Sequence, residues 1–256
     1  MKKGIIFSDV DGTLLFQKSC GLEEISTSNG ITKVKSQSRE FLTETASTNN
    51  YKFYINTKTK QLAKELVKDY YFVLVTAARK STTESRKNLL DFADFHILEN
   101  GGIILDNNFL IDKEWDSSFS KDLLHKLKED LERQGWTIDM KGRTTMIRLK
   151  NKNLEKISLP KGLKSTSSQD DLEIIPTNSG KENAIKYLAK KLGLKNTIGI
   201  GNDINDIEML KATKRKYVLR SSNDKLIEIA KMQGWHISEE LFMAGINEIL
   251  KAIKNS

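Results

Sequence analysis

Residues 4–13 read Gly4-Ile5-Ile6-Phe7-Ser8-Asp9-Val10-Asp11-Gly12-Thr13, and this stretch decides the fold. Its first half is an apolar run typical of a buried parallel strand, and its second half presents two carboxylates one residue apart. Open α/β sheets bind ligands at the carboxyl ends of their strands. Asp9 and Asp11 would repel each other unless a cation lay between them, and oxygen ligands of this kind suit Mg²⁺. The alternative for the short Asp-x-Asp-Gly pattern is a simple turn after a strand.

Strands and helices alternate through the first and last parts of the chain. Residues 71–75 form a continuous apolar run, as expected of a buried parallel strand. We expect further strands at 197–201 and 217–219, and helices at 58–69, 81–92, 224–233 and 239–253. This alternation predicts an α/β fold with a doubly wound parallel sheet.

The middle of the chain interrupts this alternation. An amphipathic helix is expected over 121–134, a hairpin of strands 136–140 and 144–149 around Gly142, and a last strand over 172–176. We therefore expect a small α+β cap domain, residues 106–176, inserted into a core formed by 1–105 and 177–256. Residues 17–50, rich in Ser, Thr and Asn, are expected to form a loop or flap that could include a short helix.

The composition limits the classes of function. At 256 residues the chain can form a core domain plus a smaller one. No apolar stretch approaches the roughly 20 residues that cross a bilayer, so we expect no membrane partner. The single cysteine, Cys20, cannot form an internal disulfide, which predicts a cytoplasmic protein. Nothing in the composition indicates an oligomeric state.

The net charge of +8 is unevenly distributed. Residues 141–164 contain eight basic residues and one acid, a local charge of +7. Such a segment is either a solvated basic face or a surface that attracts an anionic substrate. Nucleic acid is not an expected partner, because aromatic residues that stack on bases are missing there.

Thr76 follows the strand expected at 71–75. Its hydroxyl and nearby backbone N–H groups can bind a phosphoryl oxygen, although Thr is also a common helix cap. Asn56 and Thr57 follow a similar run at 53–55 and compete for this role. Lys181 begins an expected helix, where its charge opposes the helix dipole. A phosphate and the Asp9 carboxylate would offset that cost; the alternative is an ordinary solvent-exposed lysine.

Acidic residues cluster between the strand at 197–201 and the next helix, in Gly201-Asn202-Asp203-Ile204-Asn205-Asp206. Carboxylates gathered at a strand end are costly unless they bind a cation. Asn202 can offer a neutral carbonyl oxygen to Mg²⁺, and Asp203 is the alternative ligand in this turn.

Asp9-Val10-Asp11-Gly12-Thr13 resembles motif I of the haloacid dehalogenase (HAD) superfamily of phosphohydrolases, and residues 205–210 resemble its motif IV. Residues 99–104 are similar to the segment that leads into the cap of Cof-type, subfamily IIB proteins, and a cap inserted at this point is the type 2 arrangement. The sequence departs from the family at Asn202, where Asp is usual. This departure puts metal affinity in doubt more than the fold.

The resemblance implies a role for each motif residue. Asp9 would be the nucleophile and Asp11 the general acid/base. Thr76, Lys181 and Asn205 would bind the phosphoryl group. The Mg²⁺ cofactor would be held by Asp9, the Asp11 carbonyl, Asn202 and Asp206. In the cap, Arg143 and Arg148 would contact an anionic substrate.

The implied function is hydrolysis of a small phosphorylated metabolite, a sugar phosphate or a phosphoglycerate-type compound, through an aspartyl-phosphate. Two alternatives remain. One is a phosphomutase of the phosphomannomutase type, which would use the same carboxylates. The other is a binding protein whose catalysis is weakened by Asn202; intact Asp9, Asp11 and Lys181 argue against it.

Overall fold

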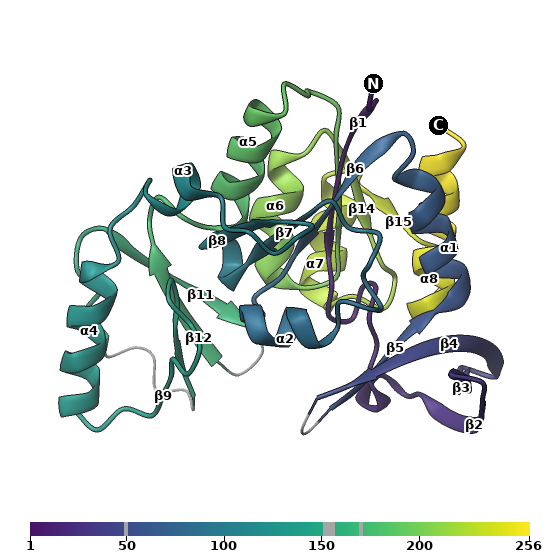
Figure 1. Ribbon diagram of the computed structural model, residues 1–256, viewed down its shortest axis with the longest axis horizontal. Coiled ribbons are helices and arrows are strands. Elements are labelled where there is room, and N and C mark those ends of the chain that lie inside the picture. The colour runs from purple at the N-terminus through teal and green to yellow at the C-terminus, as the bar shows by residue number, and fades with distance from the viewer. Residues whose placement is uncertain (49–50, 151–156, 169–170) are drawn as a thin grey trace.

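A computed structural model of the protein describes residues 1–48, 51–150, 157–168 and 171–256 (Figure 1). Its central sheet has seven strands in the order β15-β14-β13-β1-β6-β7-β8. All neighbouring strands are parallel except β7 and β8, which are antiparallel. This sheet confirms the predicted α/β fold. Its strands are β1 Gly4–Asp9, β6 Tyr70–Val75, β7 Phe95–Leu98, β8 Ile103–Asp106, β13 Thr197–Gly201, β14 Arg215–Val218 and β15 His236–Ile237.

Alternate residues of the central strands serve two separate cores. Ile5 and Phe7 face one layer with α5 (Lys181–Lys191) and α6 (Ile207–Ala212). Ile6 faces the opposite layer, which contains α1 (Thr57–Leu66) and α8 (Phe242–Lys254). Figure 1 shows these helix pairs on the two sides of β1 and β6. Helix α7 (Asp224–Met232) packs its Leu226 against Val218 of β14. The doubly wound arrangement thus follows from the period of two along each buried strand.

The helix expected over 81–92 is only half present. Helix α2 covers Lys80–Ser85, and turns follow it. Residues after Ser85 continue in turns in which N–H groups bond to the carbonyl three positions back, as Leu89 does to Arg86 and Leu90 to Lys87. Leu89, Leu90 and Phe92 are buried in the main apolar core, so tertiary packing overrides the helical spacing there. The prediction was therefore wrong for 86–92, and Arg86 lies at the end of the helix with φ −107°.

A second, antiparallel sheet has the order β11-β12-β10-β9. Helix α4 (Asp122–Arg133) covers it with Leu124, Leu127 and Leu131. The expected hairpin is present as the β9–β10 pair, with Gly142 between the strands at φ 70°. Part of the basic segment, residues 151–156, lies outside the described residues. The strands are β9 Ile138–Asp139, β10 Ile147–Leu149, β11 Leu163–Ser168 and β12 Asp171–Pro176; the one-turn helix α3 is Lys113–Asp116.

Residues 17–48 do not form the expected loop, and residues 49–50 lie outside the described residues. A 3₁₀ turn at Lys18–Cys20 leads into a third sheet of order β2-β3-β4-β5. The sequence does not predict this sheet, because the buried positions of β3 include Thr32 and Ser36 beside Val34, so apolar and polar residues do not alternate. The strands are β2 Glu23–Ser28, β3 Ile31–Ser36, β4 Arg39–Ser47 and β5 Lys52–Asn56.

The third sheet shares its buried face with the main core. Val34, Phe53 and Ile55 belong to the same apolar cluster as Ile6 and the residues of α1 and α8. It therefore lies firmly against the core, below α1 in Figure 1. Within the described ranges, every helix is too short or too polar to span a lipid bilayer.

Candidate active site

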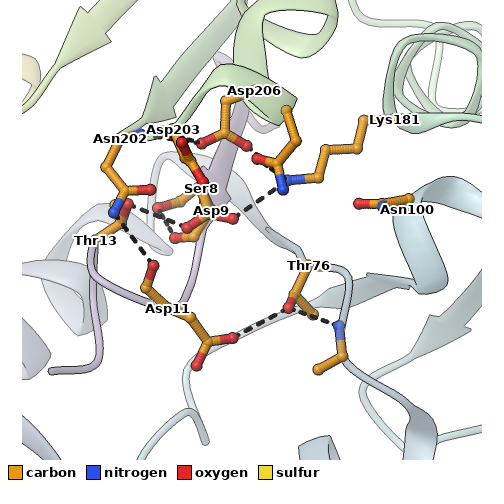
Figure 2. A network of polar contacts seen from close by, with 12 residues as sticks. Ser8, Asp9, Asp11, Thr13, Thr76, Asn100, Lys181, Asn202, Asp203 and Asp206 are labelled. Atoms are coloured by element: carbon orange, nitrogen blue, oxygen red, sulfur yellow. Dashed lines mark hydrogen bonds and ion pairs between the residues drawn. The ribbon is translucent and has the colours of Figure 1, made fainter. Parts of the chain in front are cut away.

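The site lies beside β1, where the order in which the chain adds strands to the central sheet reverses. From β1 the chain continues to β6, β7 and β8 on one side, and it returns to β13, β14 and β15 on the other. Asp9 is the last residue of β1, and Asn202 directly follows β13. The carboxyl ends of strands at such a switch point are the usual ligand position in open α/β sheets. Figure 2 shows the side chains that gather there.

Asp9 is almost completely buried. Its Oδ2 accepts a hydrogen bond from Thr13 Oγ1 at 3.2 Å, and its Oδ1 lies 3.3 Å from Lys181 Nζ. Burial, and then repulsion from Asp206, raise the pKa of Asp9 well above its ordinary value, while Lys181 acts in the opposite direction. The site thus carries more negative charge than one lysine neutralises, which suits an additional cation.

Lys181 is held between two carboxylates, so it is not a solvent-exposed lysine. Its Nζ lies 2.6 Å from Asp206 Oδ1 and 3.5 Å from Asn205 Oδ1. Burial disfavours its charge, but attraction to Asp206 and Asp9 outweighs this and raises the pKa of Lys181 above its ordinary value. The other oxygen of Asp206 accepts from the backbone N–H groups of Asn202 and Asp203. Asp206 therefore ties the β13 turn to the lysine.

Asn202 and Asp203 have different surroundings. Asn202 Nδ2 donates to the backbone carbonyl of Asp11 at 3.2 Å. Asp203 caps the 3₁₀ turn Ile204–Asp206 with its carboxylate, accepting from the Ile204 N–H at 2.7 Å. Gly12 permits the approach of Asn202, because a Cβ at Gly12, where φ is 82°, would lie 2.3 Å from the amide nitrogen. Asn202 is thus the residue of the pair that faces Asp11.

Thr76 contacts Asp11. Its Oγ1 lies 3.3 Å from Asp11 Oδ2 and accepts from the Ala78 N–H at 3.0 Å. The competing residue, Asn56, ends β5 in the third sheet and caps α1 through its side chain. Thr76 lines the cleft, whereas neither Asn56 nor Thr57 is among the residues that line it.

The two cap arginines line the cleft but are already engaged. Arg143 Nη1 donates to the Ala77 carbonyl at 2.8 Å, which connects the cap to the loop after β6. Burial lowers the pKa of Arg143 to about 10. Arg148 pairs with the buried Glu173 of β12. Neither guanidinium is therefore a freely exposed anion receptor.

The cleft around the site has a volume of about 1100 Å³ and three walls. The strand ends and loops of the central sheet supply one of them, and Arg143 and Arg148, in and beside β10 of the second sheet, belong to another. The third belongs to the N-terminal sheet and its approach, including Gln17, Ser19, Thr48 and Phe53. Sequence reasoning missed this wall, because the strands behind it were not recognised. It also missed Arg86, whose partner Asp11 lies 75 positions away and leaves no local signal.

The donors fit a hard cation in their chemistry. Asp9, the Asp11 carbonyl and the Asn202 side-chain oxygen are oxygen ligands of the kind Mg²⁺ takes. In the described part of the chain, no three His, Cys, Asp or Glu side chains surround a common point. A metal here would thus depend on carbonyl and amide oxygens as well as on carboxylates.

The fold and the site define a doubly wound α/β protein with an acidic centre at its switch point. A sequence model of the family described as haloacid dehalogenase-like hydrolase matches residues 148–240, which include Lys181 and the turn after β13. No curated protein matches the sequence.

Solved structures share the fold over nearly the whole chain. A protein from Thermoplasma acidophilum has a TM-score of 0.70 at 16% identity, covering 100% of both chains. The sucrose-phosphatase from Synechocystis, solved with sucrose and phosphate, has a TM-score of 0.64 at 15% identity, covering 100% of this chain and 98% of that one. A HAD subclass IIB sugar phosphatase has a TM-score of 0.66 at 14% identity, covering 99% of this chain and 98% of that one. The family-model match bears out the resemblance to the HAD superfamily over residues 148–240, and the solved structures show that the fold is shared.

Proposed function

We propose that the protein is a Cof-type HAD phosphatase that hydrolyses a small phosphomonoester, with Mg²⁺ as cofactor. Its core would comprise residues 1–105 and 177–256, and its cap 106–176. One observation carries the proposal: Asp9 is buried at the switch point, with Lys181 and Asp206 beside it from distant parts of the chain. A buried, lysine-paired carboxylate at the ligand-binding edge of the sheet is suited to nucleophilic attack.

The chemistry proceeds in two steps. An Asp9 carboxylate oxygen forms a bond to phosphorus as the bond to the alcohol oxygen breaks, and Asp11 gives its proton to that oxygen. Asp11 then takes a proton from the water that hydrolyses the aspartyl-phosphate. Lys181 neutralises charge on the phosphoryl group. A bound Mg²⁺, held by Asp9, the Asp11 carbonyl and Asn202, with Asp206 behind them, would supply further positive charge.

The cleft favours a hydroxylated leaving group. Its third wall carries the uncharged polar side chains of Gln17, Ser19 and Thr48, and Ser221 and Asn223 lie on the core side. Hydroxyl and amide groups bind sugar-like alcohols by hydrogen bonds without requiring a second charge on the substrate. The engaged state of Arg143 and Arg148 supports the same conclusion. A sugar phosphate is therefore the substrate class we propose.

The test is a panel of phosphorylated metabolites, assayed for inorganic phosphate with and without Mg²⁺. We expect Mg²⁺-dependent release without a bisphosphate activator, and we expect Asp9→Asn to reduce it by at least about 1000-fold while retaining the fold. Phosphate release only with a bisphosphate would indicate a mutase. Binding of the esters without turnover would indicate a binding protein, and near-wild-type activity of Asp9→Asn would refute covalent catalysis.

A further inference from the structure

A buried arginine contacts the side chain that we propose as the acid/base. Arg86, at the end of α2, is 1% exposed, and its Nη1 forms an ion pair with Asp11 Oδ1. Its Nε donates to the Thr82 carbonyl at 3.2 Å. A buried guanidinium needs acceptors for its N–H groups, and Asp11 Oδ1 is one of them. The proposed mechanism gives Arg86 no role.

The N-terminal sheet holds Arg86 from its other side. The guanidinium carbon lies 4.6 Å from the centre of the Phe53 ring, and Phe53 is buried in β5. A planar guanidinium over an aromatic face is a favourable and orienting contact. Arg86 is therefore fixed by three elements: its own helix, β5, and the loop that carries Asp11.

The Asp11 carboxylate is held at both oxygens. Oδ1 pairs with Arg86, and Oδ2 lies 3.3 Å from Thr76 Oγ1. Its side chain is nevertheless 43% exposed and borders the cleft. An exposed carboxylate samples several rotamers unless donors fix it. Proton transfer requires a fixed position within hydrogen-bond reach of the leaving oxygen, and small displacements reduce the rate strongly.

We propose that Arg86 is the positioning residue of Asp11 and that Phe53 supports it from the N-terminal sheet. Arg86 holds Oδ1 and so fixes the plane of the Asp11 carboxyl group, while the other oxygen, Oδ2, carries the proton to the leaving alcohol oxygen of a phosphomonoester. The inference rests on the proposed phosphatase function. It gives the N-terminal sheet a part in catalysis that the cap does not have.

The experiment is a double-mutant cycle in the phosphorylation step, measured by single turnover. Its variants are Arg86→Gln, Arg86→Lys, Asp11→Asn, the Arg86→Gln/Asp11→Asn double variant and Phe53→Leu. The substrates are an alkyl phosphate, which needs leaving-group protonation, and p-nitrophenyl phosphate, which needs little. Lys87→Gln, at an exposed neighbouring position, is the control. Circular dichroism and thermal unfolding establish that each variant is folded.

We expect Arg86→Gln to slow the phosphorylation step roughly 10- to 100-fold with the alkyl phosphate and only a few-fold with p-nitrophenyl phosphate. In the Asp11→Asn background the same change should cost less than about twofold, because the partner is already lost. Arg86→Lys should recover part of the rate, and Phe53→Leu should lower it in the same leaving-group-dependent way. The positioning role is refuted if Arg86→Gln slows the phosphorylation step equally with both substrates. It is also refuted if the change costs the same factor in the wild-type and Asp11→Asn backgrounds. In either case the protein would still be a phosphatase. Wild-type protein that is inactive on every phosphomonoester would overturn the function and this inference together.

Discussion

At the scale of single residues, the site depends on a lysine enclosed by carboxylates. Lys181 is 3% exposed and lies between Asp9 and Asp206. Lys181→Met would leave two buried carboxylates without their counter-charge. We expect the free energy of unfolding to fall by about 3–5 kcal/mol, measured by urea denaturation at pH 7 without Mg²⁺.

Lys186 on the same helix provides the matched control. It pairs with Glu182 on the surface, so Lys186→Met should cost less than about 1 kcal/mol. Equal losses for the two variants would show that Lys181 is not the counter-charge of the site.

The difference between Asn202 and Asp203 yields a prediction about the metal. Asn202 faces the Asp11 carbonyl, whereas the Asp203 carboxylate caps a turn. A carboxylate at position 202 would be repelled by that carbonyl unless a cation lay between them. Asn202→Asp should therefore lower the Mg²⁺ concentration for half-saturation, roughly tenfold, in calorimetry and in activity. Asp203→Asn keeps the capping oxygen, so it should change the Mg²⁺ concentration for half-saturation little. The reverse pattern would identify Asp203 as the ligand.

At the scale of elements, β7 carries a buried histidine that makes stability depend on pH. His96 is 3% exposed, stacks on Phe109, and has no hydrogen-bond partner for Nδ1 among the described residues. Burial lowers its pKa to about 4. The unfolded chain takes up this proton near pH 6.5 and the folded chain only near pH 4. The neutral histidine thus leaves stability intact above pH 6.5, and stability falls as the pH drops toward 4.

Comparison of wild type with His96→Leu isolates this effect. Between about pH 4.5 and 6 the wild type should lose up to about 1.4 kcal/mol of unfolding free energy per pH unit more than the variant. His125→Asn, at an exposed position on α4, should retain the wild-type slope. A His96→Leu curve parallel to wild type would mean that His96 is protonated in the folded protein.

The elements also show what the sequence could predict. Strands β1, β6 and β13 were predicted because parallel strands buried on both faces are continuous apolar runs. In contrast, β11 has the sequence Leu163-Lys-Ser-Thr-Ser-Ser168, and β3 buries Thr32 and Ser36, so neither shows the pattern of a strand. Their pairing depends on neighbouring strands, which local sequence does not specify.

The same limit applies to the site. The proximity of Asp9, Lys181 and Asp206 could be predicted from the sequence, because each lies at the end or the beginning of a recognisable element. Arg86 lies in a Ser- and Thr-rich stretch where nothing distinguishes it from its neighbour Lys87. Only the fold places its guanidinium against Asp11. The roles of all these residues in catalysis stay predictions.

At the scale of the whole molecule, the groups that we propose for the chemistry and those that we propose for recognition of the alcohol come from different parts of the cleft. Asp9 at the end of β1, the turns after β1 and β13, and the start of α5 supply the carboxylates and Lys181. The N-terminal sheet and the segment before it line the same cleft with uncharged polar groups. The cap arginines there are engaged by Glu173 and by the Ala77 carbonyl. The alcohol is therefore expected to contact the N-terminal wall.

This arrangement predicts a selective effect of Gln17→Ala and Ser19→Ala. For the best sugar phosphate found in the panel, we expect KM to rise several-fold with kcat little changed, because a hydrogen bond to substrate is worth about 0.5–1.5 kcal/mol in both ground and transition states. For acetyl phosphate, whose acetate leaving group has no sugar hydroxyl groups for these side chains to bind, both constants should stay near wild type. Thr27→Ala, on the exposed part of β2, is the control within the same sheet. If the two wall variants leave KM for the sugar phosphate unchanged, Gln17 and Ser19 do not bind the alcohol.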